Sequence, residues 1–167
     1  MPTFKRILVP TDFSELSAYA ARCAKCLAEV HKSEIHVVHV VVPPVISETV
    51  ALAPGVEPLP TAPSLDSFIE GARDGLKTFI AAQFPGISVV SEVLIGTAHG
   101  QICQYAERNN IDLIVIGSHG RGVVHRLFLG SVSKSVLENS PCPVLMAPLR
   151  AASTPDAPQP PPPPCSA

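Results

Sequence analysis

The sequence predicts an α/β fold: a three-layer, doubly wound domain built on a parallel five-stranded sheet. Short runs rich in Val, Ile and Leu alternate along the chain with segments of helical periodicity. Several of these runs lack the polar alternation of a half-exposed strand, which is typical of parallel strands covered on both faces. Parallel strands joined by right-handed helical crossovers give this layered architecture.

The first three elements are a strand, a helix and a strand. The first strand covers residues 5–9, a short apolar run that Pro10 ends. The helix has Ser14 as its N-cap and Glu15 in its first turn, where the helix dipole favours an anion. Residues 34–42, rich in Val and Ile, form the second strand. Helical spacing predicts one apolar face on the helix, made of Leu16, Tyr19, Ala20, Cys23, Leu27 and Val30.

A second helix and a third strand come next. Helical spacing places this helix over residues 65–80, and Gly71 and Gly75 are expected to let it pack closely on the sheet. The third strand, residues 88–95, has polar residues in its middle, which indicates an edge position. The residues whose spacing marks the second helix are Leu65, Phe68, Ile69, Ala72, Leu76, Phe79 and Ile80.

The remaining elements are two helices and two strands. Thr97 is the expected cap of a third helix that ends near Asn109. Residues 112–116 are the most continuous apolar strand, and a helix over 131–139 leads to the last strand, residues 143–147. The third helix is expected to carry Ile102, Cys103 and Ala106 on its inward face.

Composition excludes several classes of function. Twelve basic and 14 acidic residues give a formal net charge of -2, so bulk electrostatics do not favour binding to nucleic acid or to a membrane surface. No apolar stretch reaches the roughly 18 residues that a membrane-spanning helix needs. Five cysteines, an odd number without a framework spacing, favour a reducing, cytoplasmic location.

Proline divides the chain into a domain and a tail. Of the 19 prolines, seven fall within residues 151–167, where missing backbone donors prevent a helix or a sheet ladder. We therefore expect one domain over residues 1–150 and a Pro-rich disordered or polyproline II tail over 151–167. Residues 43–63 form a second Pro-rich segment, a long connection between two elements.

A glycine-rich loop follows the most apolar strand. Ligands of doubly wound sheets bind at the carboxyl ends of the strands, where the strand order reverses. There, Gly117 closes the strand, Gly120 follows, and Gly130-Ser131 opens a helix. A helix N-terminus offers unpaired N–H donors and a positive dipole end, which suit a phosphate. The spacing is neither a Walker A loop nor a Rossmann fingerprint, and the alternative role for these glycines is a tight turn with close helix packing.

These residues resemble a known family. Gly117 and Gly120, then nine residues, then Gly130-Ser131 are similar to the nucleotide-binding signature of the ATP-binding branch of the universal stress protein family. The segments 7–14 and 140–145 resemble that family's first strand with its loop and its last strand. The resemblance covers residues 3–148, nearly everything except the tail.

The resemblance implies an adenine nucleotide alpha hydrolase-like sheet of order 3-2-1-4-5 with ATP, accompanied by Mg, over its strand ends; AMP or ADP remains an alternative ligand. It implies that Asp12 contacts the ribose or the adjacent polar part, and that Val40 contacts the adenine edge through its backbone. It also implies a homodimer paired through the last strand, Pro143 to Ala147. The nucleotide-binding residues carried over by position are Pro10, Thr11, Asp12, Val40, Ile116, Gly117, His119, Gly120, Arg121, Gly130, Ser131 and Val132.

The implied function is a nucleotide-dependent switch in stress adaptation, in which bound nucleotide orders the loop 117–130 and the connection 42–63. One alternative is a slow ATPase or an autophosphorylating enzyme with Ser131 or Ser133 as acceptor, although no catalytic base is evident. The other alternative is an interaction module that does not use nucleotide. Asp12 itself has a structural alternative as a turn or helix-capping carboxylate.

Four further residues have the pattern of possible ligands or redox groups. Cys23 and Cys26 form a C-x-x-C within the first helix rather than at its start, so we interpret them as packing residues and not as a redox pair. No metal site is predicted. His36 and His39 on the second strand are expected to lie on one face of the sheet, as packing residues rather than metal ligands.

Overall fold

The computed structural model describes residues 4–43, 64–118 and 130–147. Within these ranges the chain forms five strands and four helices. Their order along the chain matches the alternation that the sequence predicts. The elements are β1 (Arg6–Pro10), α1 (Glu15–His31), β2 (Glu34–Val41), α3 (Leu65–Gln83), β3 (Val89–Ile95), α4 (Ala98–Arg108), β4 (Leu113–Gly117), α5 (Ser131–Asn139) and β5 (Val144–Ala147).

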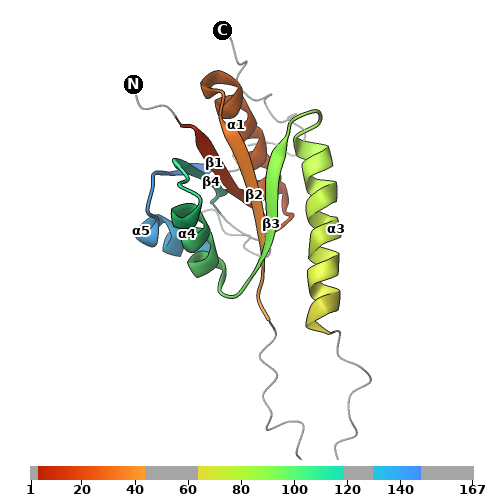
Figure 1. The fold of residues 1–167 in the computed structure, drawn as a ribbon. Coiled ribbons are helices and arrows are strands. Elements are labelled where there is room, and N and C mark those ends of the chain that lie inside the picture. The colour runs from red at the N-terminus through yellow and green to blue at the C-terminus, as the bar shows by residue number, and fades with distance from the viewer. Residues whose placement is uncertain (1–3, 44–63, 119–129, 148–167) are drawn as a thin grey trace, which may run out of the picture.

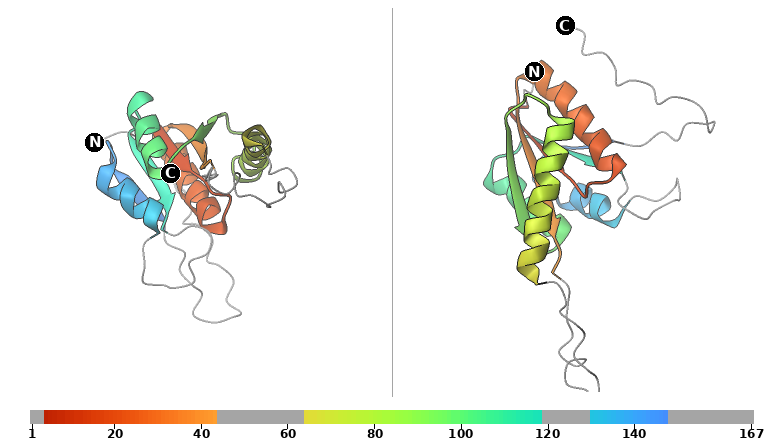
Figure 2. Two further views of the ribbon diagram at one scale, coloured as in Figure 1. Left: turned by 90° about the horizontal axis from the view of Figure 1, so that it is seen from below. Right: turned by 90° about the vertical axis from the view of Figure 1, so that its right-hand side faces the viewer.

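All five strands are parallel and form one sheet of order β3-β2-β1-β4-β5 (Figure 1). Helices α1 and α3 pack on one face of the sheet, and α4 and α5 cover the other (Figure 2). The fold class, the three layers and the strand order are therefore confirmed. Because β1 lies between β2 and β4, the strand order reverses at β1, which is where such folds bind ligands.

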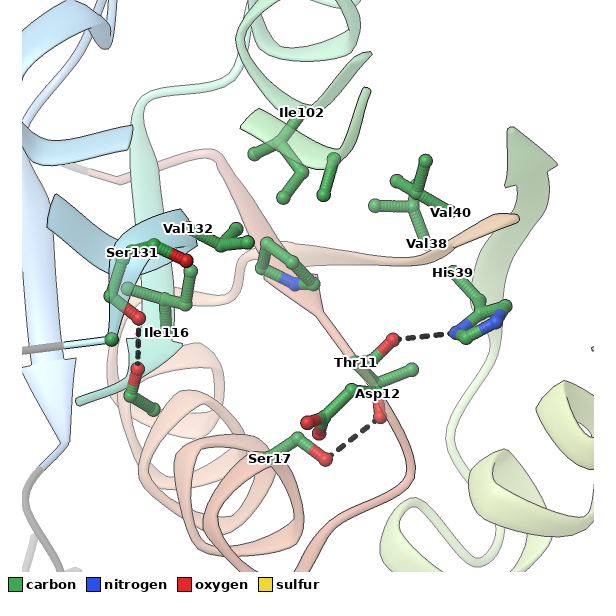
Figure 3. A pocket seen from close by; sticks show the side chains of 15 residues that line it. Thr11, Asp12, Ser17, Val38, His39, Val40, Ile102, Ile116, Ser131 and Val132 are labelled. Atoms are coloured by element: carbon green, nitrogen blue, oxygen red, sulfur yellow. Dashed lines mark hydrogen bonds between the residues drawn. The ribbon is translucent and has the colours of Figure 1, made fainter. Parts of the chain in front are cut away.

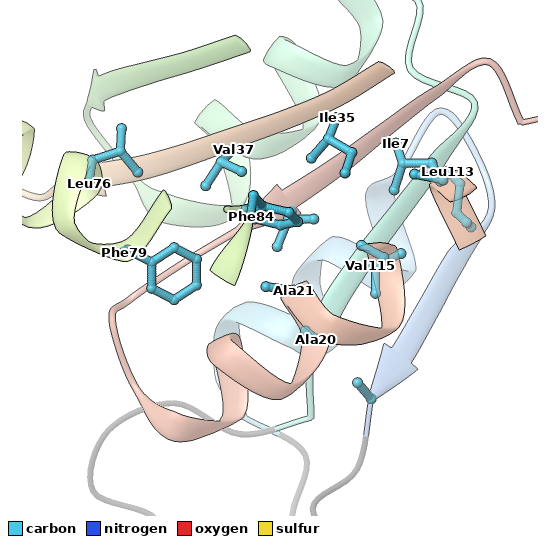
Figure 4. Packing of buried hydrophobic residues seen from close by; sticks show 14 residues of the cluster. Ile7, Ala20, Ala21, Ile35, Val37, Leu76, Phe79, Phe84, Leu113 and Val115 are labelled. Carbon is cyan, nitrogen blue, oxygen red and sulfur yellow. The ribbon is translucent and has the colours of Figure 1, made fainter. Parts of the chain in front are cut away.

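The core under α1 is built from small side chains. Ala20 and Ala21 are fully buried against the sheet (Figure 4), and Ala24 is fully buried as well. The small size of these side chains lets the helix axis lie close to the strands. The predicted apolar face of α1 is only partly correct, because Val30 is 64% exposed at the last turn of the helix. Ser14 caps this helix as predicted, accepting a hydrogen bond from the Ser17 N–H.

Helix α3 contributes less to the core than its apolar spacing predicts. Leu76 and Phe79 are buried, but Leu65 and Phe68 are 40% and 42% exposed. Figure 1 gives the reason, since the N-terminal end of α3 extends beyond the end of β3. The predicted helix is therefore confirmed, but its apolar residues at the N-terminal end do not reach the sheet.

The two glycines of α3 do not pack on the sheet. A Cβ on Gly75 would lie 3.1 Å from two ring carbons of Phe13, so this glycine makes room for the loop after β1. A Cβ on Gly71 would meet nothing within 4 Å, and close packing at this position is not observed. The edge position of β3 is confirmed, with Ser91 and Glu92 both exposed.

The tail over 151–167 and most of the Pro-rich connection, residues 44–63, lie outside the described residues, so both expectations stay predictions. Among the helices that are described, none is long and apolar enough to cross a membrane.

Candidate functional site

A pocket of about 340 Å³ opens at the carboxyl ends of β1, β2 and β4 (Figure 3). Three elements complete it: the loop after β1, the start of α4 and the start of α5. Its position agrees with the reversal of strand order at β1. The described residues that line it are Pro10, Thr11, Asp12, Ser17, Val38, His39, Val40, Ala98, Ile102, Ile116, Gly117, Gly130, Ser131, Val132 and Ser133.

Nine of the twelve residues carried over by the family resemblance lie in this pocket, and the other three, His119, Gly120 and Arg121, lie outside the described residues. Sequence reasoning missed five lining residues, Ser17, Val38, His39, Ala98 and Ile102, and considered a sixth, Ser133, only as a possible phosphate acceptor. Two signals were available for some of them. Val38 lies two residues from Val40 on a strand, and Ala98 and Ile102 lie four apart on a helix, so each of these pairs shares a face.

The pocket has two chemically different sides. Val38 and Val40 of β2 and Ile102 of α4 gather on one side and make it apolar (Figure 3). On the other side the first turn of α5 begins at Ser131, which is exposed. The N–H groups of a first helical turn have no partner within the helix, so this side offers hydrogen-bond donors and the positive end of a helix dipole. A ligand with a flat apolar group at one end and an anion or hydroxyl group at the other would match both sides of the pocket.

Thr11 anchors the loop that joins β1 to α1. Its N–H donates to the Val38 carbonyl at 2.9 Å. Its buried hydroxyl donates to the Ser17 hydroxyl at 2.9 Å and accepts from the Phe13 N–H at 3.0 Å. The Ser17 hydroxyl donates in turn to the Ser14 carbonyl at 2.8 Å. These bonds tie the end of β1 to the first turn of α1 and so fix the position of the residue between them.

That residue is Asp12, whose carboxylate lines the pocket and also caps the loop. Its Oδ1 accepts the N–H of Ser14 at 3.0 Å and the hydroxyl of Ser14. The structural alternative considered from the sequence, a turn-capping carboxylate, is therefore observed. A carboxylate has two oxygens with about four lone-pair sites, so capping by Oδ1 is compatible with a further role at the pocket.

Gly117 has a packing role that is independent of any ligand. A Cβ at this position would lie 3.1 Å from the Leu16 Cβ and 3.2 Å from the Leu16 carbonyl carbon and oxygen. The glycine therefore lets α1 approach the end of β4. The carbonyl of Gly117 accepts a 2.7 Å hydrogen bond from the hydroxyl of Ser133, which is buried. Of the two serines considered as phosphate acceptors, Ser133 is thus enclosed and already donating, whereas Ser131 is exposed.

The two histidines of β2 lie on opposite faces of the sheet, which overturns the expectation that they share one. They are three residues apart, and an odd separation on a strand reverses the side. His36 is buried on the α4 side, where its Nδ1 lies 2.9 Å from the Tyr105 hydroxyl. The Nδ1 of His39 lies 2.8 Å from the Thr11 carbonyl oxygen, and its ring stacks on Phe13 at the edge of the pocket.

The cysteines of the described segments have the environment of packing residues. Burial raises the pKa of the Cys23 thiol, and burial also raises the pKa values of Cys103 and Cys142. A reactive redox cysteine has its pKa lowered instead, so the interpretation of Cys23 and Cys26 as packing residues is supported at Cys23. The described residues contain no group of three or more His, Cys, Asp or Glu side chains that could hold a metal ion.

Comparison with known proteins agrees with the fold and the motifs. A family model described as "Universal stress protein family" matches residues 3–148. The chain belongs to the universal stress protein family. Universal stress protein MJ0531 of Methanocaldococcus jannaschii is 32% identical to it over 151 residues, which is 86% of this chain and 81% of that protein.

Two solved structures extend the comparison. The structure of the protein MJ0577, which served for a structure-based assignment of its biochemical function, superposes with a TM-score of 0.73 at 26% identity, covering 90% of this chain and 100% of that one. A universal stress protein crystallised in complex with cAMP has a TM-score of 0.55 at 19% identity, over 87% of this chain and 98% of that one. The second likeness shows the fold alone.

Proposed function

We propose that this universal stress protein binds an adenine nucleotide, with ATP and Mg as the expected ligand, and acts as a nucleotide-dependent switch. One observation carries the proposal: a single pocket places an apolar wall opposite the N-terminus of α5. A nucleotide has the same division, with an apolar base at one end and phosphates at the other. The volume of about 340 Å³ falls in the range of ligand pockets.

The apolar wall suits the base, and the backbone of Val40 suits its edge. Val38 directs its carbonyl toward β1, since it accepts the Thr11 N–H, and residues two apart on a strand direct their backbone groups to the same side. The N–H and the carbonyl of Val40 therefore point to the side of β1, where the pairing of β1 with β2 has ended at Pro10 and Val38. One donor beside one acceptor matches adenine, which accepts at N1 and donates from N6; guanine has the reverse pattern.

The N-terminus of α5 suits the phosphates, and Asp12 suits the ribose. Ser131 and Val132 present first-turn N–H groups together with the positive end of the helix dipole, which attract an anion. The carboxylate of Asp12 is a hydrogen-bond acceptor that fits ribose hydroxyls, and it can also hold a water of a hydrated Mg ion, which usually keeps several waters beside phosphates. The universal stress protein in complex with cAMP indicates that this fold accommodates an adenine nucleotide.

Two further parts of the proposal concern assembly and location. Strand β5 lies at the edge of the sheet, so one side of its backbone is available for pairing with a second copy, and Leu145 on it is 40% exposed. We infer a homodimer paired through residues 143–147, in the cytoplasm.

Binding rather than catalysis is proposed because Ser133 is enclosed and phosphoryl transfer requires a positioned base.

The test is to denature freshly purified protein, identify released nucleotide by mass spectrometry, and titrate the stripped protein calorimetrically with ATP, ITP and GTP in the presence of Mg. We expect one ATP per chain and weaker binding of ITP and GTP, because both reverse the hydrogen-bond pattern at the base edge. Equal binding of all three would reject the role of Val40. No binding of any of them would leave the interaction module as the better hypothesis.

A further inference from the structure

At the end of the β1–β2 ladder, a side-chain N–H takes the place of a backbone N–H as the hydrogen-bond donor. The Thr11 N–H donates to the Val38 carbonyl, as a parallel ladder requires. If the ladder continued, the Thr11 carbonyl would accept the N–H of Val40. The Nδ1 of His39 lies 2.8 Å from that carbonyl oxygen instead. A carbonyl only accepts, so Nδ1 carries the hydrogen and the imidazole is the donor.

The imidazole of His39 is held in this orientation by an aromatic stack. Its ring lies 4.3 Å from the ring of Phe13, centroid to centroid, with an interplanar angle of 21°. Phe13 has a positive φ of 63°. Its ring packs beside the ring of Phe79 and lies where a side chain on Gly75 would otherwise be. A phenylalanine rarely adopts this φ, so the surrounding contacts impose the turn that brings its ring over His39.

We propose that His39 is the positioning residue of the base site: by occupying the Thr11 carbonyl, it leaves the backbone edge of Val40 open to the base of the bound nucleotide. This inference rests on the proposed function, because it assigns a purpose to the open edge. Without the imidazole, the Thr11 carbonyl would lose its donor, and the donor that a continued parallel ladder offers it is the N–H of Val40. The β1–β2 ladder would then be longer by one hydrogen bond. The Val40 N–H would be engaged in that bond and no longer available to adenine N1.

The tests use two amide side chains that differ in reach. An Asn side chain can place an N–H where the Nδ1 of His39 lies, whereas the longer Gln side chain places its N–H near the position of Nε2. His39→Asn should therefore preserve the arrangement, and His39→Gln and His39→Leu should lose it. His36→Asn is the matched control, because His36 lies on the same strand with its side chain on the opposite face.

The first readout is the hydrogen exchange of the Val40 amide, measured by NMR on nucleotide-free protein. We expect fast exchange in the wild type, in His39→Asn and in His36→Asn. We expect exchange slower by about tenfold or more in His39→Gln and His39→Leu, since a new hydrogen bond protects the amide. An unchanged Val40 amide in both of the last two variants would overturn the proposal, whatever their affinity for nucleotides.

The second readout is the affinity for Mg-ATP and for Mg-tripolyphosphate, which has no base. For His39→Gln and His39→Leu we expect ATP affinity to fall by about tenfold, the equivalent of one hydrogen bond, with tripolyphosphate affinity unchanged. A parallel loss of both affinities would indicate a merely structural role and overturn the proposal. If the wild type itself binds no nucleotide, the proposed function fails, while the exchange data still decide whether His39 replaces Val40 at the Thr11 carbonyl.

Discussion

The hydroxyl of Ser133 donates a 2.7 Å hydrogen bond to the carbonyl of Gly117 and so joins the first turn of α5 to the end of β4. The carbonyl needs this donor because β1 pairs with β4 only at Leu113 and Ile114, well before Gly117. Ser133 is 4% exposed, so water does not replace it easily. The bond holds the N-terminus of α5 at the pocket, where the proposed phosphate site lies.

Replacing this serine by alanine leaves a buried carbonyl without its partner. For Ser133→Ala we expect the free energy of unfolding to fall by about 1–3 kcal/mol, the usual cost of an unsatisfied buried polar group. Urea unfolding followed by circular dichroism measures it. Ser135→Ala, on the same helix and more exposed, should change stability by less than about 0.5 kcal/mol. Equal stability of Ser133→Ala and wild type would show that water satisfies the Gly117 carbonyl.

Two glycines of the chain should respond in opposite directions to a single methyl group. In Gly117→Ala the new Cβ would press on the backbone of α1 at Leu16, so we expect destabilisation of about 1–3 kcal/mol. In Gly71→Ala the new Cβ would meet nothing, and alanine favours an exposed helix, so we expect stabilisation of up to about 1 kcal/mol. The urea unfolding midpoints of the two variants, compared with that of the wild type, test both expectations. A stabilised Gly117→Ala variant would refute the packing role of Gly117.

The sheet could be predicted because strands buried on both faces leave short, uninterrupted apolar runs such as β4. Helix burial was harder to predict, since Phe68 and Phe79 follow the same spacing on α3 but only Phe79 lies over the sheet. The difference depends on how far the helix extends past β3, and the local pattern of α3 does not contain that information. The alanines of α1 illustrate the same limit, because their depth depends on the close approach of the helix to the sheet.

Pocket residues that belong to a sequence motif could be predicted, whereas pocket residues whose role depends on contacts with distant parts of the chain could not. Gly130 and Ser131 stand in a glycine pattern that resembles a known signature, and they line the pocket. His39 was missed because its role depends on the Thr11 carbonyl, 28 residues earlier in the chain, and on a ring stack with Phe13. Neither contact leaves a spacing in the sequence of β2 that would distinguish His39 from a packing residue.

Stability should fall at alkaline pH because buried thiols resist ionisation. Burial raises the pKa of Cys23, so the folded protein keeps this proton at a pH where the unfolded chain has lost it. The resulting stabilisation is fully present below the unfolded thiol pKa of about 8.5 and is lost as pH rises from there through the raised folded pKa.

The same direction holds for Cys103 and Cys142, where burial is again the main cause. We expect urea midpoints of the wild type to decline between about pH 8 and pH 10. The decline should become shallower when Cys23, Cys103 and Cys142 are all replaced by alanine, with each variant compared to its own midpoint at pH 7. An identical decline in the triple variant would assign the effect to other groups.

The hydroxyls of Thr11 and Ser17 should act as a pair. They are buried, lie 2.9 Å apart and connect the end of β1 to α1 beside Asp12. Thr11→Val and Ser17→Ala each remove one partner and leave other groups of the loop without theirs, including the Phe13 N–H in the case of Thr11→Val. The cost of the double variant should therefore be smaller than the sum of the two single costs, by about 0.5–1.5 kcal/mol.

The measurement is a double-mutant cycle of urea unfolding, with ATP titrations of the same four proteins. We expect ATP affinity to weaken in all three variants, because the loop that carries Asp12 loses its anchor to α1. Ser67→Ala is a suitable control, since the Ser67 hydroxyl also donates to a backbone carbonyl three residues earlier, on the exposed start of α3. Strict additivity of the two substitutions would mean that Thr11 and Ser17 contribute separately, and that the 2.9 Å contact does not couple β1 to α1.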